Sequence, residues 1–222
     1  MTETNSIEKE TREPVLNVVD RVSEMLFGLF MALTFIGVVT VADAGREEVR
    51  EMFVTALGCN LAWGLVDAVM YLVRTVTERG RQLTLVRSVK AADAAGGRRL
   101  VEASLTKAMA GLVAPAELEA IRGRIAALSS LPARPRLNGD DLLAALAIFL
   151  IVVGATFPVV LPFLLIQDIG VALPLSRGIA LLMLFLGGLA LGRFAGYGSW
   201  KVGFMMAGLG TALVVAIILL GG

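Results

Sequence analysis

The sequence predicts an all-α, polytopic membrane protein with five transmembrane helices and a cytoplasmic helical insert between spans two and three. Two observations predict this class. Hydrophobic residues make up 57% of the 222 residues, which is above the usual apolar content of soluble domains. These residues are also gathered into long runs, and a helix needs about 20 mostly apolar residues to cross a bilayer.

Five segments have the length and composition of a span: 22–42, 52–73, 142–166, 178–195 and 202–220. Residues 171–175, which precede the fourth segment, either extend that span or lie at the membrane interface. The chain then divides into a polar N-terminal tail (1–20), spans one and two (21–75), the insert (76–138) and spans three to five (139–222). The tail is acidic and lacks the basic-then-apolar order of a signal peptide, so we expect it to be disordered or to lie on a surface.

The insert is rich in alanine and arginine, which favour helix. Glycine and proline interrupt it at Gly96, Gly97, Pro115, Pro132 and Pro135. These breaks predict three amphipathic helices, near 82–95, 98–112 and 116–130.

Basic residues flank both ends of the insert, and basic residues near membrane ends mark the cytoplasmic side. Residues 74–138 contain twelve basic and five acidic residues, a balance of +7, whereas the short loop 43–51 has a balance of −2. We expect a multi-pass protein of a bacterial cytoplasmic membrane, with its N-terminus inside and its C-terminus outside. The basic face of the insert lies near anionic lipid or binds a specific partner.

Several chemistries are excluded by composition. The chain has no histidine and a single cysteine, Cys59. Histidine metal sites, multi-cysteine zinc sites and a Ser-His-Asp triad are therefore impossible. The formal net charge of +1 gives no reason to expect a nucleic-acid partner, and no nucleophile motif is present. We expect no enzymatic activity and no tightly bound cofactor.

Span two carries polar residues at regular spacing. Asn60, Asp67 and Arg74 are each seven residues apart, so they lie on nearly one face of a helix. A charged residue in the middle of a spanning helix costs about 2.5–3.5 kcal/mol on insertion scales and usually faces a bundle interior or a watery cavity. Arg74 lies at the interface, where its side chain can reach the headgroups.

Span one has a matching stripe on one face: Asp20, Glu24, Phe27, Met31 and Thr34. A short loop joins spans one and two, so we expect them to be antiparallel neighbours, with Glu24 and Asp67 both toward the cytoplasmic end. Carboxylate and amide oxygens suit hard cations, and a thioether favours softer ones. We therefore predict a divalent-cation site formed by Glu24, Asp67, Asn60 and Met31.

Each of these residues also has a structural interpretation. Glu24 can be an interfacial residue paired with Arg21, Asp67 can hydrogen-bond to another helix for packing alone, and Met31 can fill the core. Pro158 and Pro162 in span three either free carbonyls toward a pathway or only shape the end of the helix. The glycines at 188, 192 and 196 in span four allow close helix contact, within one chain or between two.

This arrangement of five spans, a long insert and acidic residues on the first two spans resembles the vacuolar iron transporter family. The segments that carry the resemblance are 23–29 (SEMLFGL), 62–67 (AWGLVD) and 154–162 (GATFPVVLP). The resemblance implies a homodimer that exports ferrous iron or manganese from the cytosol in exchange for protons. It also implies that Glu24 and Asp67 take the acidic positions of the pathway, with Met31 as a thioether ligand.

The insert departs from that family, whose insert carries a dense cluster of glutamates with methionines. Here the glutamates of residues 74–138 are Glu78, Glu102, Glu117 and Glu119, among twelve basic residues. A basic insert repels cations rather than gathering them, which argues against a multi-metal site there and suggests a divergent member.

The expected function is a secondary transporter of divalent cations, iron or manganese, working as a proton antiporter. Its partners would be the metal ion, the lipid bilayer and a second copy of the chain. The alternative is a membrane scaffold that transports nothing and whose basic cytoplasmic helices bind a partner or anionic lipid.

Overall fold

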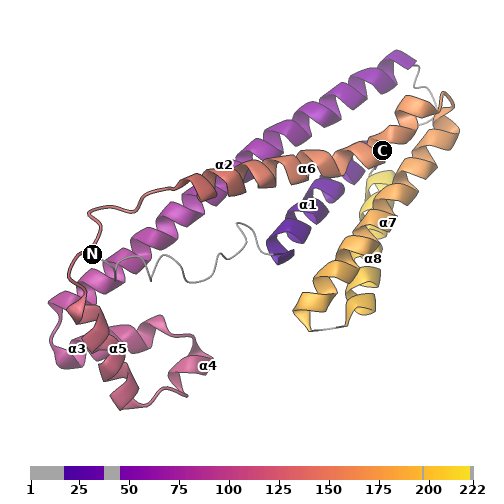
Figure 1. Cartoon of the computed structure of the whole chain (residues 1–222). Helices are drawn as coiled ribbons and strands as arrows, with labels where there is room; N and C mark the ends of the chain where they lie inside the picture. Colours follow the sequence, from indigo (N-terminus) through magenta and orange to yellow (C-terminus); the bar gives the residue numbers. More distant parts are fainter. Residues whose placement is uncertain (1–17, 38–45, 197, 221–222) are drawn as a thin grey trace. The chain divides into compact units, whose positions relative to one another are not determined.

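The computed structural model describes residues 18–37, 46–196 and 198–220. The described residues form eight α-helices and no strand (Figure 1), which confirms the all-α prediction for this part of the chain. The helices are α1 (Val18–Gly37), α2 (Arg46–Ala91), α3 (Ala94–Ser104), α4 (Lys107–Ala110), α5 (Pro115–Ala127), α6 (Gly139–Leu165), α7 (Ile169–Ala195) and α8 (Ser199–Leu219). Most of the predicted tail, and residues 38–42 of the predicted first span, lie outside the described residues.

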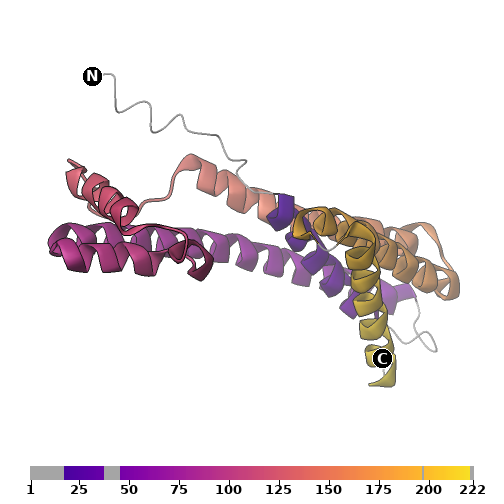
Figure 2. The same ribbon diagram turned by 90° about the horizontal axis from the view of Figure 1, so that it is seen from below.

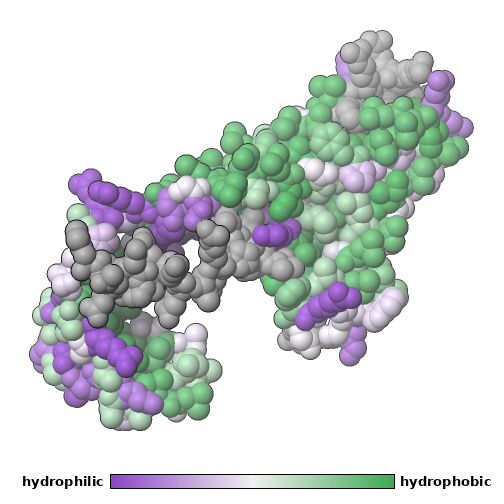
Figure 3. Space-filling model, in the orientation of Figure 1, coloured by the Kyte–Doolittle hydropathy of each residue, from purple (hydrophilic) through white to green (hydrophobic). Residues whose placement is uncertain are grey.

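The chain forms two compact units, which are described separately below. The first contains residues 1–70 and 140–222, and the second contains residues 71–139. The residues of α2 are therefore shared between them. Apolar side chains cover much of the visible surface of the first unit's helices, whereas the second unit shows a mixed surface (Figure 3).

Three helices of the described chain are long and apolar enough to cross a membrane: Gly139–Leu165, Ile169–Phe194 and Ser199–Leu219. They correspond to the predicted spans three to five and are compatible with a multi-pass membrane protein. The helix α1 carries Asp20, Arg21 and Glu24 within its 20 residues, and neither it nor α2 is among the three. The spanning role of these two helices stays a prediction.

The helix α2 is longer than the sequence predicted. It runs without interruption for 46 residues, about 69 Å at 1.5 Å per residue. The separate helix predicted near 82–95 is therefore wrong, because most of those residues continue the helix that contains the predicted span two. The reason is local: residues 74 to 91 contain no proline and one glycine, Gly80, and one glycine costs only about 1 kcal/mol.

The predicted helix near 98–112 is also divided in two. The carboxylate of Asp93 caps α3 by accepting a hydrogen bond from the Gly96 amide (2.8 Å). The hydroxyl of Thr106 then caps α4 by accepting one from the Met109 amide (3.4 Å). Two capping side chains within one alanine-rich stretch start two short helices instead of one.

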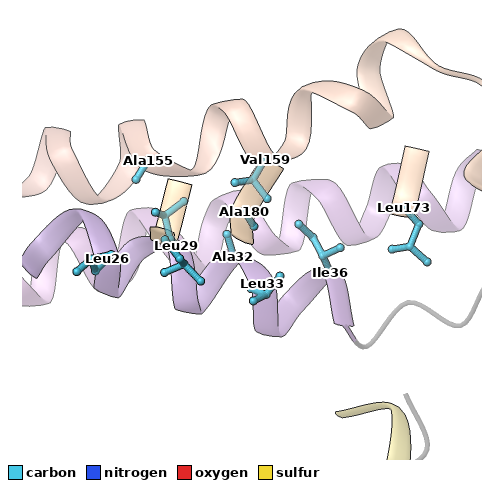
Figure 4. Close-up of a cluster of buried hydrophobic side chains, with 10 residues drawn as sticks. Leu26, Leu29, Ala32, Leu33, Ile36, Ala155, Val159, Leu173 and Ala180 are labelled. Atoms are coloured by element: carbon cyan, nitrogen blue, oxygen red, sulfur yellow. The ribbon is translucent and has the colours of Figure 1, made fainter. Parts of the chain in front are cut away.

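The core of the first unit joins α1, α6 and α7 (Figure 4). Leu29, Leu33 and Ile36 of α1 are almost completely buried against Val159 of α6 and Ala180 of α7. These α1 positions recur every three or four residues, so they form one apolar face of the helix. The face opposite carries the predicted polar stripe.

The helix α7 also packs closely against α8 through glycines. A Cβ atom added at Gly192 would lie 2.6 Å from the Cα atom of Ser199, and one added at Gly188 would lie 2.8 Å from that of Gly203. The two helices are joined by a turn in which Gly196 has a φ of 72°, a conformation that glycine adopts readily. The small-residue spacing that the sequence left open is therefore used within one chain.

The second unit has a small apolar core and a charged contact between α3 and α5. Val89, Val101 and Leu118 are buried together. Glu119 accepts hydrogen bonds from Arg122 (2.5 and 3.0 Å) and lies 3.6 Å from Arg98. The Arg122 hydrogen bond lowers the pKa of the Glu119 carboxyl, and the same contact raises the pKa of Arg122.

The lowered pKa makes the stability of α5, where Arg122 bonds Glu119, and to a smaller extent of its contact with Arg98 of α3, depend on pH. A group whose pKa is lower in the folded state stabilises the fold at neutral pH. This contribution is lost as the pH falls below the ordinary pKa of glutamate and through the lower folded value. We expect Glu119→Gln to speed amide exchange in α3 and α5 at pH 7, measured by mass spectrometry against wild type at the same pH. The difference should shrink in acid, and Glu102→Gln is the control.

A segment that we call the strap, residues 128–138, lies along the C-terminal half of α2. It is held by cationic side chains of α2 that donate to its backbone carbonyls. Arg87 donates to Pro132 and Ala133 (2.9 and 2.8 Å), Arg79 donates to Arg136 (2.7 Å), and Lys90 donates to Leu128. Part of the basic face that the sequence assigned to lipid or a partner is therefore occupied by the chain's own backbone.

Candidate functional site

The first half of α2 presents a packed face of three buried residues, Asn60, Gly64 and Ala68. A Cβ atom at Gly64 would lie 3.2 Å from Phe149 and 3.3 Å from Val153 of α6. Small residues at this spacing let α6 approach α2 closely. Because α6 packs against this face of α2, the side chain of Asn60 is fully buried, with 0% of its surface exposed.

The buried amide of Asn60 is only partly satisfied. Its Nδ2 donates to the hydroxyl of Thr156, which itself donates to the Val152 carbonyl (3.5 Å). Since the hydroxyl proton is directed at Val152, the hydroxyl oxygen accepts from the amide, and this fixes the orientation of the Asn60 side chain. The Oδ1 atom is buried and has no hydrogen-bond partner among the described residues. Buried polar atoms are normally paired, so this oxygen is available to a donor or a cation.

An aromatic contact fixes the register between α1 and α2, which run in opposite directions (Figures 1 and 2). The rings of Phe27 and Trp63 meet edge to face, with centroids 5.8 Å apart and planes inclined by 72°. Glu24 precedes Phe27 by three residues, and Asp67 follows Trp63 by four. On antiparallel helices these offsets place Glu24 and Asp67 at one level, about 5 Å from the aromatic pair.

The same register places Met31 and Asn60 at a second level, on the other side of the aromatic pair. Met31 follows Phe27 by four residues, and Asn60 precedes Trp63 by three. The four predicted ligands therefore form two levels, one with two carboxylates and one with a thioether and an amide.

The environments of the other predicted ligands differ from that of Asn60. Glu24, Met31 and Asp67 are all partly buried. The Oδ2 atom of Asp67 is shielded from solvent, and both Glu24 and Asp67 make polar or electrostatic interactions with the chain. Within the described ranges no three acidic or cysteine side chains gather closely enough to hold a metal ion. A cation at the first level would therefore meet two carboxylates, and a cation at the second level would meet a thioether and an amide.

Pro158 of α6 does not contribute a carbonyl to these levels. Pro158 is exposed, whereas Thr156, two residues earlier, is buried. A proline removes the donor to the carbonyl four residues earlier, which is that of Gly154, also exposed. The freed carbonyl thus belongs to the exposed side of α6, away from the side that carries Thr156.

The helix α7 adds two polar residues that the sequence did not single out. Ser176 is fully buried and donates to the Val159 carbonyl of α6. Arg177 lies eight residues into α7, whereas the predicted span began after it, and its Nε atom is buried without a hydrogen-bond partner in the described part of the chain. A fixed positive charge repels metal cations, so a cation pathway would follow α1 and α2 rather than α7.

Thr156 is the functional candidate that the sequence reasoning missed. Its signal was present, since it is the one hydroxyl residue between Leu142 and Ile166 in an otherwise apolar span. Only the packing of α6 against α2 shows that it pairs with Asn60. Comparisons of the chain with protein families, with curated proteins and with solved structures gave no match.

Proposed function

We propose that the protein is a secondary transporter of divalent metal cations, with iron or manganese as substrate, and that it exports them from the cytosol in exchange for protons. In this proposal α1 and α2 also span the membrane, which gives five spans with the 71–139 unit in the cytoplasm. The chain would act as a homodimer. The transported ion would be held by Glu24 and Asp67 at one level and by Met31 and Asn60 at the other.

The observation that carries the proposal is the buried Oδ1 atom of Asn60, which has no hydrogen-bond partner among the described residues and lies one level away from two carboxylates. A polar atom buried without a partner costs about 1–3 kcal/mol. A dehydrated cation passing along α1 and α2 would offset this cost by coordinating the oxygen. The hydrogen bond to Thr156 accounts for the Nδ2 group of Asn60, but it leaves the Oδ1 atom without a partner among the described residues.

Proton coupling follows from the chemistry of the carboxylate level. A carboxylate shielded from water binds protons more tightly than one in solution. Glu24 and Asp67 would therefore hold either a divalent cation or protons, and exchange of one for the other would drive export. The aromatic pair of Phe27 and Trp63 lies between the two levels and would limit passage to a partly dehydrated ion.

The test is transport by the purified protein in proteoliposomes. Ferrous iron, manganese, cobalt and zinc would each be offered with and without a pH gradient, beside protein-free vesicles. We expect flux of at least one of these ions, accelerated by the gradient, with accompanying proton movement. Absence of flux for every ion would remove the transporter proposal.

The scaffold alternative is supported by the basic composition of the 71–139 unit. It predicts no flux, and it predicts that function depends on exposed arginines rather than on Asp67. Arg98 is a weak candidate for such a role because it already lies 3.6 Å from Glu119. Arg99 is exposed on the same helix and would be the better residue to neutralise.

A further inference from the structure

A groove of about 550 Å³ lies within the 71–139 unit, between α2 and the strap. Its polar lining consists of Arg79, Gln82, Arg134, Arg136 and Asn138. Buried Leu83 also contributes to the lining. The volume is in the range of small-molecule sites, which combine an apolar lining with a few convergent polar groups.

The electrostatics of the groove are one-sided. Three guanidinium groups line it, and none of its described lining residues is acidic. A second cavity of the same unit lacks this property, because Glu78 lies 3.3 Å from Arg81 among its lining residues. Three like charges around one groove repel one another, and a bound anion would remove that repulsion.

The two strap arginines are not needed to hold the strap in place. The attachments to α2 are made by strap carbonyls and by the side chains of Arg79, Arg87 and Lys90. The guanidinium groups of Arg134 and Arg136 have no ion pair or hydrogen bond with the described part of the chain. Pro132 and Pro135 restrict the backbone beside them, so both arginines are displayed on a stiff segment.

We propose that this groove is a binding site for a phosphate-bearing anion, contacted by Arg134 and Arg136 with Arg79 beside them. The planar guanidinium fork matches phosphate oxygens with two parallel hydrogen bonds. The amide side chains of Gln82 and Asn138 also line the groove, and that of Gln82 donates to Glu78 (3.4 Å). The phosphate would belong either to the headgroup of an anionic lipid or to a soluble phosphate compound. The site is independent of the proposed transport function.

The test uses the full-length protein in nanodiscs of phosphatidylcholine. Binding of inorganic tripolyphosphate is measured by titration calorimetry, and the lipid arm measures the thermal stabilisation produced when phosphatidylglycerol replaces phosphatidylcholine. The variant is Arg134→Gln with Arg136→Gln. The control, Arg99→Gln with Arg124→Gln, removes the same charge from exposed positions outside the groove.

We expect the groove variant to bind tripolyphosphate about a hundredfold more weakly, since each lost guanidinium contact is worth about tenfold in affinity. In the lipid arm, we expect it to lose all of the thermal stabilisation by phosphatidylglycerol. The control should lose at most a few-fold. Tripolyphosphate binding that needs the groove identifies a soluble ligand, and stabilisation by phosphatidylglycerol alone identifies a headgroup. If wild type responds to neither probe, or if variant and control behave alike, the groove is not a phosphate site.

Discussion

Replacing Asp67 by asparagine should reduce metal flux in proteoliposomes by at least about tenfold while leaving the protein folded. The substitution keeps the shape of the side chain and removes the negative charge and the proton-binding group together. Asp67 has one oxygen shielded from solvent, and charge-assisted contacts in such settings are worth more than the 1.4 kcal/mol that corresponds to tenfold. Glu24→Gln removes the second carboxylate of the same level and should have an effect of the same order.

The matched control for this experiment is Asp140→Asn. Asp140 is an exposed carboxylate in the first turn of α6 and lies outside the two proposed levels, so its loss should leave flux close to wild type. Thermal unfolding of each purified variant separates a lost site from a lost fold. Flux that is unchanged in both Asp67→Asn and Glu24→Gln would show that the carboxylate level plays no part in transport.

The second large effect is expected at Gly192, where a single methyl group should destabilise the first unit by about 1–3 kcal/mol. The added Cβ atom would lie 2.6 Å from the Cα atom of Ser199. Because the atom it meets is backbone, the clash is relieved only if α7 and α8 separate, and overpacking of this kind typically costs about 1–3 kcal/mol. The measurement is thermal unfolding of the Gly192→Ala variant in detergent, in which the destabilisation would appear as a lowered Tm.

Gly178→Ala is the control, on the same helix and with the same chemical change. A Cβ atom there would have no neighbour within 4 Å, and alanine favours helix over glycine by about 1 kcal/mol. The two substitutions should therefore shift Tm in opposite directions. Equal shifts would mean that α7 and α8 do not meet at Gly192.

Much of the helical framework could be predicted from apolar runs alone. The runs at 142–166 and 202–220 match α6 and α8 within about three residues, because length and hydropathy dominate there. The helix boundaries in the insert could not be predicted as well. Asp93 and Thr106 look like ordinary polar residues in the sequence, and their capping role appears only once the backbone around them is known.

The sequence singled out the residues of the candidate site other than Thr156, but it did not give their geometry. The seven-residue spacing placed Asn60 and Asp67 on one face of α2 without any knowledge of the fold. That Phe27 meets Trp63, and that Asn60 meets Thr156 of α6, depends on contacts between segments far apart in the chain. The sequence left open whether residues 171–175 extend the fourth span, and the structure includes them in α7, with Pro174 inside the helix.

The way the strap is attached has a consequence for how this protein can change during evolution. Every residue type has the same backbone carbonyl, so the contacts from Arg87 and Lys90 do not depend on which side chains the strap carries. Substitutions at positions 134 and 136 would alter what the groove recognises without loosening the segment that displays them. In the strap, the residues that attach the segment are therefore different from the residues that would recognise a ligand. Substitutions at a few surface positions of the strap could change the ligand while α2, to which the strap is attached, stays the same.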